Sequence, residues 1–200
     1  VQGVSYRVPG TQDNLLNQVT FSLPEKSLGL IYGRSGSGKT TLLQVLSGLV
    51  EPTEGSIYLK RKGLDRQLND SREIFSATKV GLVFQFPERY FLADTVVEEL
   101  TFGWKRQLED QLLRQQFRMR LESAILAVGL NGIALDLNPR SLSDGFKRRL
   151  ALAVQLVRMP DILLLDEPLA GLDWKSRADV VKLLENLKKN IMLVVVSHDL

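Results

Sequence analysis

A run of glycine, lysine and threonine residues early in the chain has the spacing that suits phosphate binding. It reads Gly33-Arg34-Ser35-Gly36-Ser37-Gly38-Lys39-Thr40-Thr41. Glycines let the backbone curl until successive amides between Arg34 and Thr41 face one anion, and a helix that begins here directs its positive dipole end at that anion. In this pattern Lys39 reaches the β- and γ-phosphates of a nucleotide, and the Thr40 hydroxyl holds Mg²⁺. The alternative is a glycine-rich turn that ends in Lys-Thr by chance.

Two adjacent carboxylates follow an apolar run much later in the chain. Asp166 and Glu167 come directly after residues 162–165, which are all isoleucine or leucine. Asp166 suits the Mg²⁺ shell, and Glu167 suits a residue that orients or deprotonates an attacking water. The alternative is a strand that simply ends in acidic residues. Together with the glycine-rich run, the pair predicts phosphate chemistry.

These residues need strands and helices to position them. Strands are predicted at Leu28–Tyr32, Lys79–Phe84, Asp161–Asp166 and Ile191–Val196, and a helix at Thr40–Leu49. Short apolar runs that alternate with amphipathic helices indicate an α/β fold with a largely parallel sheet. From Pro87 to Ser141 strand patterns vanish and apolar residues recur at helical intervals. We therefore expect a single domain, 1–200, with a nucleotide-binding core (1–86 and 142–200) and a helical subdomain (87–141).

Composition narrows the function classes. The 200 residues are 44% hydrophobic and 24% charged, which is typical of one globular domain. The chain has no cysteine and its one histidine is His198, which excludes disulfides, thiolate sites and multi-histidine metal centres. The 26 Lys and Arg are interleaved with 23 Asp and Glu, so we expect no direct nucleic-acid binding. No apolar run approaches the ~20 residues of a membrane span, so any membrane role requires a partner. The chain starts without Met and stops soon after a strand, so we expect a C-terminally trimmed domain whose targeting segment lies elsewhere.

Four further segments occur in a recognisable order along the chain. They are Gln85 after a strand, Leu142-Ser143-Asp144-Gly145-Phe146 with the following residues 147–153, Ala170-Gly171-Leu172-Asp173, and His198 at a strand end. With the glycine-rich run and the carboxylate pair, they resemble the ATP-binding-cassette ATPases, whose signature is typically Leu-Ser-Gly-Gly-Gln. The resemblance spans almost the whole chain. It implies an ATPase with a RecA-like P-loop NTPase core, a parallel sheet and a helical insertion.

The resemblance also implies a role for each matched residue. Gln85 senses Mg²⁺ and the nucleotide state, His198 contacts the γ-phosphate, and Asp173 communicates across a dimer. Ser143 and Gly145 complete the ATP site of the opposite subunit. Other interpretations stay open: Gln85 as a solvated strand end, Asp173 as the cap of a helix near residue 174, and His198 as a polar residue leaving a strand.

Two longer stretches narrow the resemblance. Residues 84–103 are similar to energy-coupling-factor and cobalt-type ATPases, and Arg148–Leu184 resembles the soluble chloroplast members of the plant ABC transporter I family. These similarities imply a homo- or heterodimer that drives a separate transmembrane subunit, coupled near Glu88–Phe102. They also imply a chloroplast location, peripheral to a membrane, with a cytoplasmic location as the alternative. A soluble ATPase that acts on a protein or nucleic-acid complex is the alternative function. A small-molecule kinase would leave residues 142–145 unexplained.

Three positions depart from the family pattern. Asp144 replaces a glycine; if it faces the partner's γ-phosphate, repulsion could reach about 4 kcal/mol at ~4 Å and an effective dielectric of ~20. The same carboxylate favours its own helix dipole by ~0.3–1 kcal/mol. We expect Asp144 to slow hydrolysis without abolishing nucleotide binding. Phe146 replaces glutamine, and Val8 stands near the position of an adenine-stacking aromatic, which predicts weak selection of ATP over GTP. Tyr6 is expected in the core instead.

Overall fold

The protein contains two sheets, which the computed structural model describes over residues 1–58, 79–104 and 110–198. Four parallel strands lie in the order β3-β7-β6-β5, formed by β3 (Leu28–Tyr32), β7 (Met192–Ser197), β6 (Ile162–Asp166) and β5 (Val80–Val83). Three antiparallel strands lie in the order β2-β1-β4, formed by β2 (Asn14–Val19), β1 (Gln2–Arg7) and β4 (Glu54–Ser56). Because the first sheet is parallel, the carboxyl ends of its strands meet at one edge.

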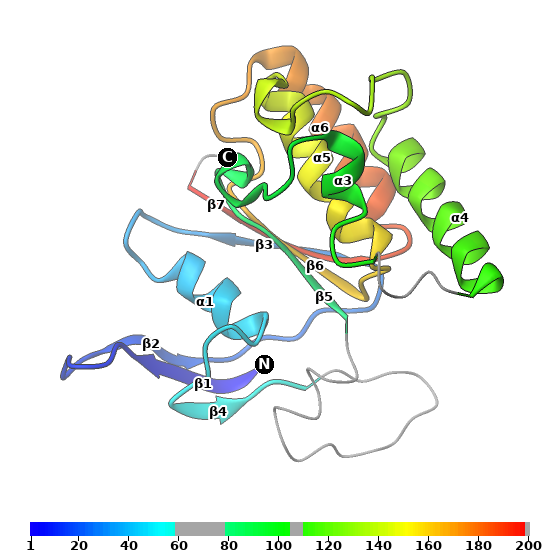
Figure 1. Ribbon diagram of the computed structural model, residues 1–200. Helices are drawn as coiled ribbons and strands as arrows, with labels where there is room; N and C mark the ends of the chain where they lie inside the picture. Colours follow the sequence, from blue (N-terminus) through cyan, green and yellow to red (C-terminus); the bar gives the residue numbers. More distant parts are fainter. Residues whose placement is uncertain (59–78, 105–109, 199–200) are drawn as a thin grey trace.

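Helices cover both faces of the parallel sheet (Figure 1). They are α1 (Lys39–Leu46), α3 (Val96–Leu100), α4 (Gln111–Ala127), α5 (Asp144–Val157) and α6 (Trp174–Leu187), with short 3-10 turns at Pro87–Tyr90 and Pro139–Ser141. Helix α1 lies between the two sheets, while α5 and α6 cover the opposite face and α3 and α4 pack against α5. No helix in the described ranges is both long and apolar enough to cross a membrane.

The apolar core is divided by the parallel sheet. In β6, Leu163 and Leu165 belong to the cluster formed with α5 and α6, whereas Leu164 belongs to the cluster formed with α1. All three side chains are at most 1% exposed. Strand side chains alternate between faces, so a strand covered on both sides must be apolar throughout. This is why β6 and β7 read as unbroken apolar runs in the sequence.

Polar caps set where several helices begin. Thr95 accepts a hydrogen bond from the backbone amide of Glu98 at the start of α3, and Asp110 accepts one from Leu112 at the start of α4. The Asp173 carboxylate accepts from the amide of Ser176 at 3.0 Å and so begins α6. Such caps contribute about 1 kcal/mol each. Asp173 thus caps a helix, as one of the two interpretations expected.

The α/β fold and its parallel sheet are as predicted, with strand ends displaced by a residue or two. Between residues 87 and 141 the described part contains helices and turns without strands. The antiparallel sheet was not predicted. Gly55 lies in its strand β4 with φ +86°, and a Cβ there would stand 2.2 Å from the Gly3 carbonyl oxygen. The predicted ranges 1–86, 87–141 and 142–200 include residues 59–78, 105–109 and 199–200, which lie outside the described residues.

Candidate active site

A cavity of about 350 Å³ opens at the carboxyl edge of the parallel sheet. Its walls are formed by Leu15, Ser35, Gly36, Gly38, Lys39, Thr40, Thr41, Gln85, Asp166, Glu167 and His198. The loops after β3, β5, β6 and β7 therefore converge here, because parallel strands end on the same side. Apart from Leu15 on β2, every lining residue was predicted from sequence. Leu15 was missed because the sheet that carries it was not predicted.

The loop between β3 and α1 has the geometry of a phosphate cradle. Gly36 and Gly38 adopt left-handed φ values of +80° and +88°, which residues with a Cβ rarely adopt. A Cβ at Gly38 would also stand 2.9 Å from the Leu16 side chain. The loop carries the first turn of α1 to the cavity wall, where helix amides and dipole favour an anion. The predicted residues Gly33, Arg34 and Ser37 belong to this loop without lining the cavity.

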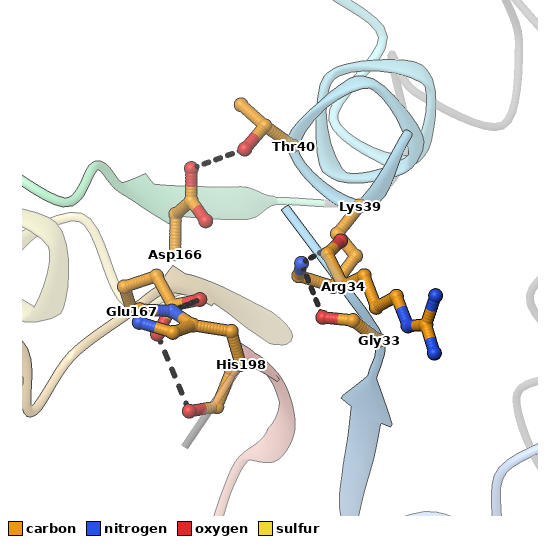
Figure 2. Close-up of polar contacts among 8 residues, drawn as sticks. Gly33, Arg34, Lys39, Thr40, Asp166, Glu167 and His198 are labelled. Carbon is orange, nitrogen blue, oxygen red and sulfur yellow. Dashed lines mark hydrogen bonds and ion pairs between the residues drawn. The ribbon is translucent and has the colours of Figure 1, made fainter. Parts of the chain in front are cut away.

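Lys39 folds back onto its own loop. Its Nζ donates hydrogen bonds to the carbonyl oxygens of Gly33 at 2.7 Å and Arg34 at 2.8 Å, as Figure 2 shows. These contacts hold the ammonium group beside the cavity that the loop encloses. A cation at the mouth of an amide cradle suits the charge of a nucleotide's terminal phosphates.

Thr40 and Asp166 join the phosphate loop to the end of β6. The Thr40 hydroxyl donates to Asp166 Oδ2 at 2.8 Å (Figure 2). Burial raises the pKa of Asp166, and the charge of Glu167 adds to the rise, while the Thr40 hydrogen bond, Lys39 and Arg148 oppose it. An ionised carboxylate buried here therefore lacks full compensation from the protein alone. A cation would supply it.

The oxygen donors around Asp166 fit Mg²⁺. The cavity wall carries the carboxylate of Asp166, the hydroxyl of Thr40 and Gln85, all hard ligands of the kind that Mg²⁺ prefers. Within the described ranges no group of three or more His, Cys, Asp or Glu could hold a metal ion. Mg²⁺ commonly takes one or two protein ligands and completes its shell with phosphate and water. The donor set therefore fits a nucleotide-bound magnesium.

Glu167 occupies a strained and buried position. Its φ is +47°, in the left-handed region, which costs a residue with a side chain about 1–3 kcal/mol. The side chain is nearly buried, and its amide donates to the Val196 carbonyl at 2.9 Å. Its Oε2 accepts from the Ser197 hydroxyl at 3.2 Å, and Oε1 lies 2.6 Å from Nδ1 of His198 (Figure 2). The surrounding contacts thus fix one carboxylate at the cavity wall.

Ser197 was not singled out from the sequence. It stands directly before His198 and donates to Glu167, so the last residue of β7 and the histidine after it hold the same carboxylate. A hydroxyl and an imidazole at the end of a strand that neighbours β6 are the available signal. The parallel pairing of β6 and β7 brings them together.

The signature segment lies apart from this cavity. Ser143 and Gly145 are not among the lining residues; Ser143 precedes α5, and its side chain makes no capping hydrogen bond. Gly145 faces α6 so closely that a Cβ would stand 2.9 Å from Ser176 Oγ. Asp144 exposes 73% of its side chain and pairs with Lys147 Nζ at 3.1 Å. The cavity and the phosphate loop beside it therefore contain all the predicted site residues except Ser143 and Gly145, which are expected to serve a second subunit.

Asp173 sits beside the signature. Its carboxylate accepts from both the hydroxyl of Ser176, at 2.6 Å, and its amide, and these hydrogen bonds lower the pKa of Asp173. Ser176 also occupies the space that a Cβ at Gly145 would need, so the cap of α6 lies directly beside the start of α5.

Comparison with known proteins places these features together in one family. The family model described as ABC transporter matches residues 16–170. The chain is 60% identical over 200 residues to the chloroplastic ABC transporter I family member 11 of Arabidopsis thaliana, covering all of this chain and 72% of that protein. It is 38% identical to the energy-coupling factor transporter ATP-binding protein EcfA2 of Acetivibrio thermocellus, covering all of this chain and 70% of that protein.

Comparison with solved structures leads to the same family. The cbiO1 protein of Clostridium perfringens, described as part of the ABC transporter complex cbiONQ, matches with a TM-score of 0.82 and 28% identity, over 100% of this chain and 77% of that chain. The ATP-binding cassette MJ0796, in a dimeric post-hydrolysis state bound to ADP and Pi, matches with a TM-score of 0.76 and 28% identity, over 99% of this chain and 87% of that chain.

Proposed function

Since the chain belongs to the ABC transporter family and is an ATP-binding ATPase of that family, we propose that it powers a separate membrane protein. The observation that carries the proposal is the single cavity that joins the phosphate loop to Asp166, Glu167 and His198. A phosphate cradle alone would serve any nucleotide-binding protein. A buried, fixed carboxylate beside it is what hydrolysis requires in addition.

In the proposed mechanism, backbone amides of residues 34–41 and Lys39 bind the phosphates. Thr40, Asp166 and Gln85 hold Mg²⁺, which supplies charge neutralisation at the phosphates when bound. Glu167 orients the attacking water and accepts its proton on a carboxylate oxygen. Ser197 and His198 keep that carboxylate in place, at 3.2 Å and 2.6 Å, and His198 contacts the γ-phosphate.

We also propose that two subunits share each ATP site. Ser143 and Gly145 stand at the start of α5, away from their own cavity, and would complete the cavity of an opposing subunit. The opposing subunit is either a second copy or a related chain. The helical subdomain, 87–141, carries the contact with the membrane protein, and the core, 1–86 and 142–200, carries the nucleotide.

A groove near α3 supports the placement of the membrane contact. It measures about 600 Å³ and is lined by Leu92, Ala93, Asp94, Glu98, Thr101, Phe102 and Gly103. Leu92 and Phe102 expose 67% and 50% of their surface, and Asp94 and Glu98 add two negative charges. An amphipathic helix with a basic residue would satisfy both features. All the lining residues except Gly103 lie within the range Glu88–Phe102 expected for coupling.

The location proposed for the protein is the chloroplast, peripheral to a membrane. The support is the 60% identity to a relative named as chloroplastic. Fractionation of chloroplasts into envelope, thylakoid and stroma, with detection of the full-length protein, tests this. Recovery only outside the organelle would contradict the location and leave the ATPase activity intact.

The test of the basic activity is calorimetric titration with ATP, with and without Mg²⁺. The titration should show magnesium-dependent binding, and a separate assay should show phosphate release. Correctly folded protein that takes up no ATP would overturn the proposal. For the transport role, the full-length protein is captured with its partners. A multi-span membrane protein is expected, and capture with a soluble assembly alone would favour a soluble ATPase.

Reversing the groove charges sharpens the transport test. The double variant Asp94→Lys/Glu98→Lys should lose partner-stimulated ATP hydrolysis and keep the basal rate, because the groove lies outside the cavity. Glu25→Lys/Glu185→Lys makes the same charge change at exposed positions of the core, in the loop before β3 and on α6, and should leave coupling unchanged. Intact coupling in the groove variant would refute this placement.

A further inference from the structure

Arg148 is a buried cation on the helix that the signature segment begins. Its side chain belongs to α5, and the residue is only 4% exposed. In the described part of the chain no carboxylate forms an ion pair with it. Its Nη1 donates to the carbonyl oxygens of Phe84 at 3.2 Å and Gln85 at 2.6 Å, and Nη2 donates to that of Ala170 at 3.2 Å.

Burial of this guanidinium opposes stability. Its Nε is buried without a hydrogen-bond partner, and burial lowers the pKa of Arg148. The charges of Glu88, Asp144 and Asp166 offset that effect only from a distance. Buried charges without a paired partner are costly, and apolar residues of similar volume often stabilise a fold equally well or better. Packing alone therefore does not account for an arginine here.

The three carbonyl groups belong to segments that lead into the site. β5 ends at Val83, so the carbonyls of Phe84 and Gln85 lie beyond the sheet, and Arg148 binds both. The Ala170 amide donates to the Glu167 carbonyl at 3.1 Å, so Ala170 lies one turn after that residue. One side chain thus links the signature helix, the backbone of Gln85 and the loop that follows Glu167.

We propose that Arg148 is a positioning residue that holds the backbone of Gln85 so that its side chain meets the magnesium and phosphate groups. The inference rests on the proposed role of Gln85. Arg148 also couples Gln85 to the signature segment. It lies on α5, whose N-cap is Ser143, and Ser143 is proposed to face the opposing subunit's ATP. A displacement of α5 is passed to Gln85 through a 2.6 Å hydrogen bond.

The chemistry of the side chain suits this role. A guanidinium presents several donors in a rigid plane, so Nη1 and Nη2 reach carbonyls of two different loops at once. Lysine offers a single flexible ammonium and cannot fix both loops with the same geometry. Arg148→Lys is therefore expected to keep the fold and lose part of the positioning.

The experiment is a double-mutant cycle between Arg148→Met and Gln85→Ala, measured as kcat for ATP hydrolysis, with Mg-ATP affinity from calorimetry. Misplacement of a catalytic group by about 1 Å costs up to about a hundredfold in rate. We expect Arg148→Met to lower kcat about ten- to a hundredfold with less than about a threefold change in Mg-ATP affinity. In the Gln85→Ala background, Arg148→Met should lower kcat no further, because the group it positions is gone.

Arg149→Met is the matched control. The neighbouring arginine donates to Asp179 at 2.9 Å and to the Gly129 carbonyl at 3.4 Å, and in the described residues it has no hydrogen bond to Phe84 or Gln85. Whatever its effect on kcat, that effect should multiply with the effect of Gln85→Ala. Thermal unfolding of every variant identifies losses that come from the fold. If Arg148→Met does not fold, Arg148→Lys carries the same cycle.

The outcomes separate this inference from the function on which it rests. If the losses from Arg148→Met and Gln85→Ala multiply, or if Arg148→Met hydrolyses ATP like the parent, the positioning role is wrong and the proposed role of Gln85 stands. If Gln85→Ala itself hydrolyses ATP like the parent, the role of Gln85 is wrong and the inference falls with it.

Discussion

The carboxylate of Glu167 touches the ring of His198: Oε1 lies 2.6 Å from Nδ1. The contact joins the residue after β6 to the residue after β7, two strands that run side by side in parallel. Because the Ser197 hydroxyl also donates to Oε2 at 3.2 Å, both oxygens of the carboxylate are held at the cavity wall. The structure therefore prearranges the group proposed to accept a proton.

Replacing Glu167 by glutamine should separate binding from hydrolysis. Glu167→Gln keeps the shape of the side chain but removes its basicity, so kcat should fall by about 10²–10⁴. Mg-ATP should still bind, because the phosphate loop and Asp166 are unchanged. A phosphate-release assay measures kcat, and calorimetric titration measures the binding of Mg-ATP. Glu185→Gln, at an exposed position of α6, is the control. A Glu167→Gln protein with more than about a tenth of the parent rate would mean that another group takes the proton.

Asp166 should make the nucleotide-free protein less stable at neutral pH. Burial raises the pKa of Asp166 in the folded state above its value in the unfolded chain, which is ~3.9. The protonated carboxyl therefore contributes stability below the unfolded pKa, and this stability is lost as pH rises through the folded pKa. Asp166→Asn should therefore unfold at a higher temperature than the parent at pH 7–8. At this chain length each kcal/mol corresponds to about 2–4 °C.

The comparison is made by thermal unfolding from pH 3.5 to 8. The gap between Asp166→Asn and the parent should close at the acidic end, where the carboxyl is protonated in both states. Saturating Mg-ATP should reverse the order at pH 7, since the parent gains more from the ligand. Asp13→Asn removes an exposed carboxylate between β1 and β2, and it should unfold at the same temperature as the parent both across this pH range and with Mg-ATP. A parent that is more stable than Asp166→Asn at neutral pH without ligand would contradict the argument.

Asp144 should slow turnover by a modest factor. Its side chain is 73% exposed and pairs with Lys147 at 3.1 Å. Solvent and the lysine therefore reduce its repulsion of a partner's γ-phosphate well below the ~4 kcal/mol of a pair at ~4 Å and an effective dielectric of ~20. Asp144→Asn should raise steady-state turnover about two- to tenfold, which is about 0.4–1.4 kcal/mol.

Asp144→Gly restores the residue usual in the family and should raise turnover in the same direction. It should also lower the unfolding temperature, because the helix loses an acidic residue in its first turn and gains a glycine. Asp144→Asn separates the charge from the backbone effect. Both variants are assayed as verified dimers, and unchanged turnover in both would remove the repulsion hypothesis.

The sequence allowed the parallel sheet and the cavity residues to be predicted because their signals are local. A strand covered on both faces, such as β6, must be apolar throughout, and the phosphate loop is defined by spacing within a single turn. Parallel pairing then brings the ends of β3, β5, β6 and β7 to one edge without further information. The parallel sheet and the cavity-lining residues other than Leu15 followed from these two facts.

Other features depend on contacts between distant residues, which local patterns do not encode. Arg148 meets Gln85 across 63 positions, and no periodicity marks it as a ligand of backbone carbonyls. Glu167 has a left-handed φ, and its amide bonds Val196 on the neighbouring strand β7, a contact between distant residues. Strand β4, at Glu54–Ser56, is a three-residue edge strand with a left-handed glycine, and glycine predicts a turn more readily than a strand.

The N-terminal strand predicts a weak choice of base. Val8 follows β1 and is 38% exposed but does not line the cavity, while the half-buried ring of Tyr6 packs against the core cluster around Val4 and Leu16. Neither residue offers an aromatic face to a purine, so the parent should bind ATP and GTP within about threefold of each other. Competition titration measures this ratio.

Val8→Tyr should tighten ATP binding about two- to tenfold, since stacking on an aromatic ring contributes about 0.5–1.5 kcal/mol, whereas Val8→Leu should not. A parent that strongly prefers ATP would place base recognition on residues other than Val8 and Tyr6.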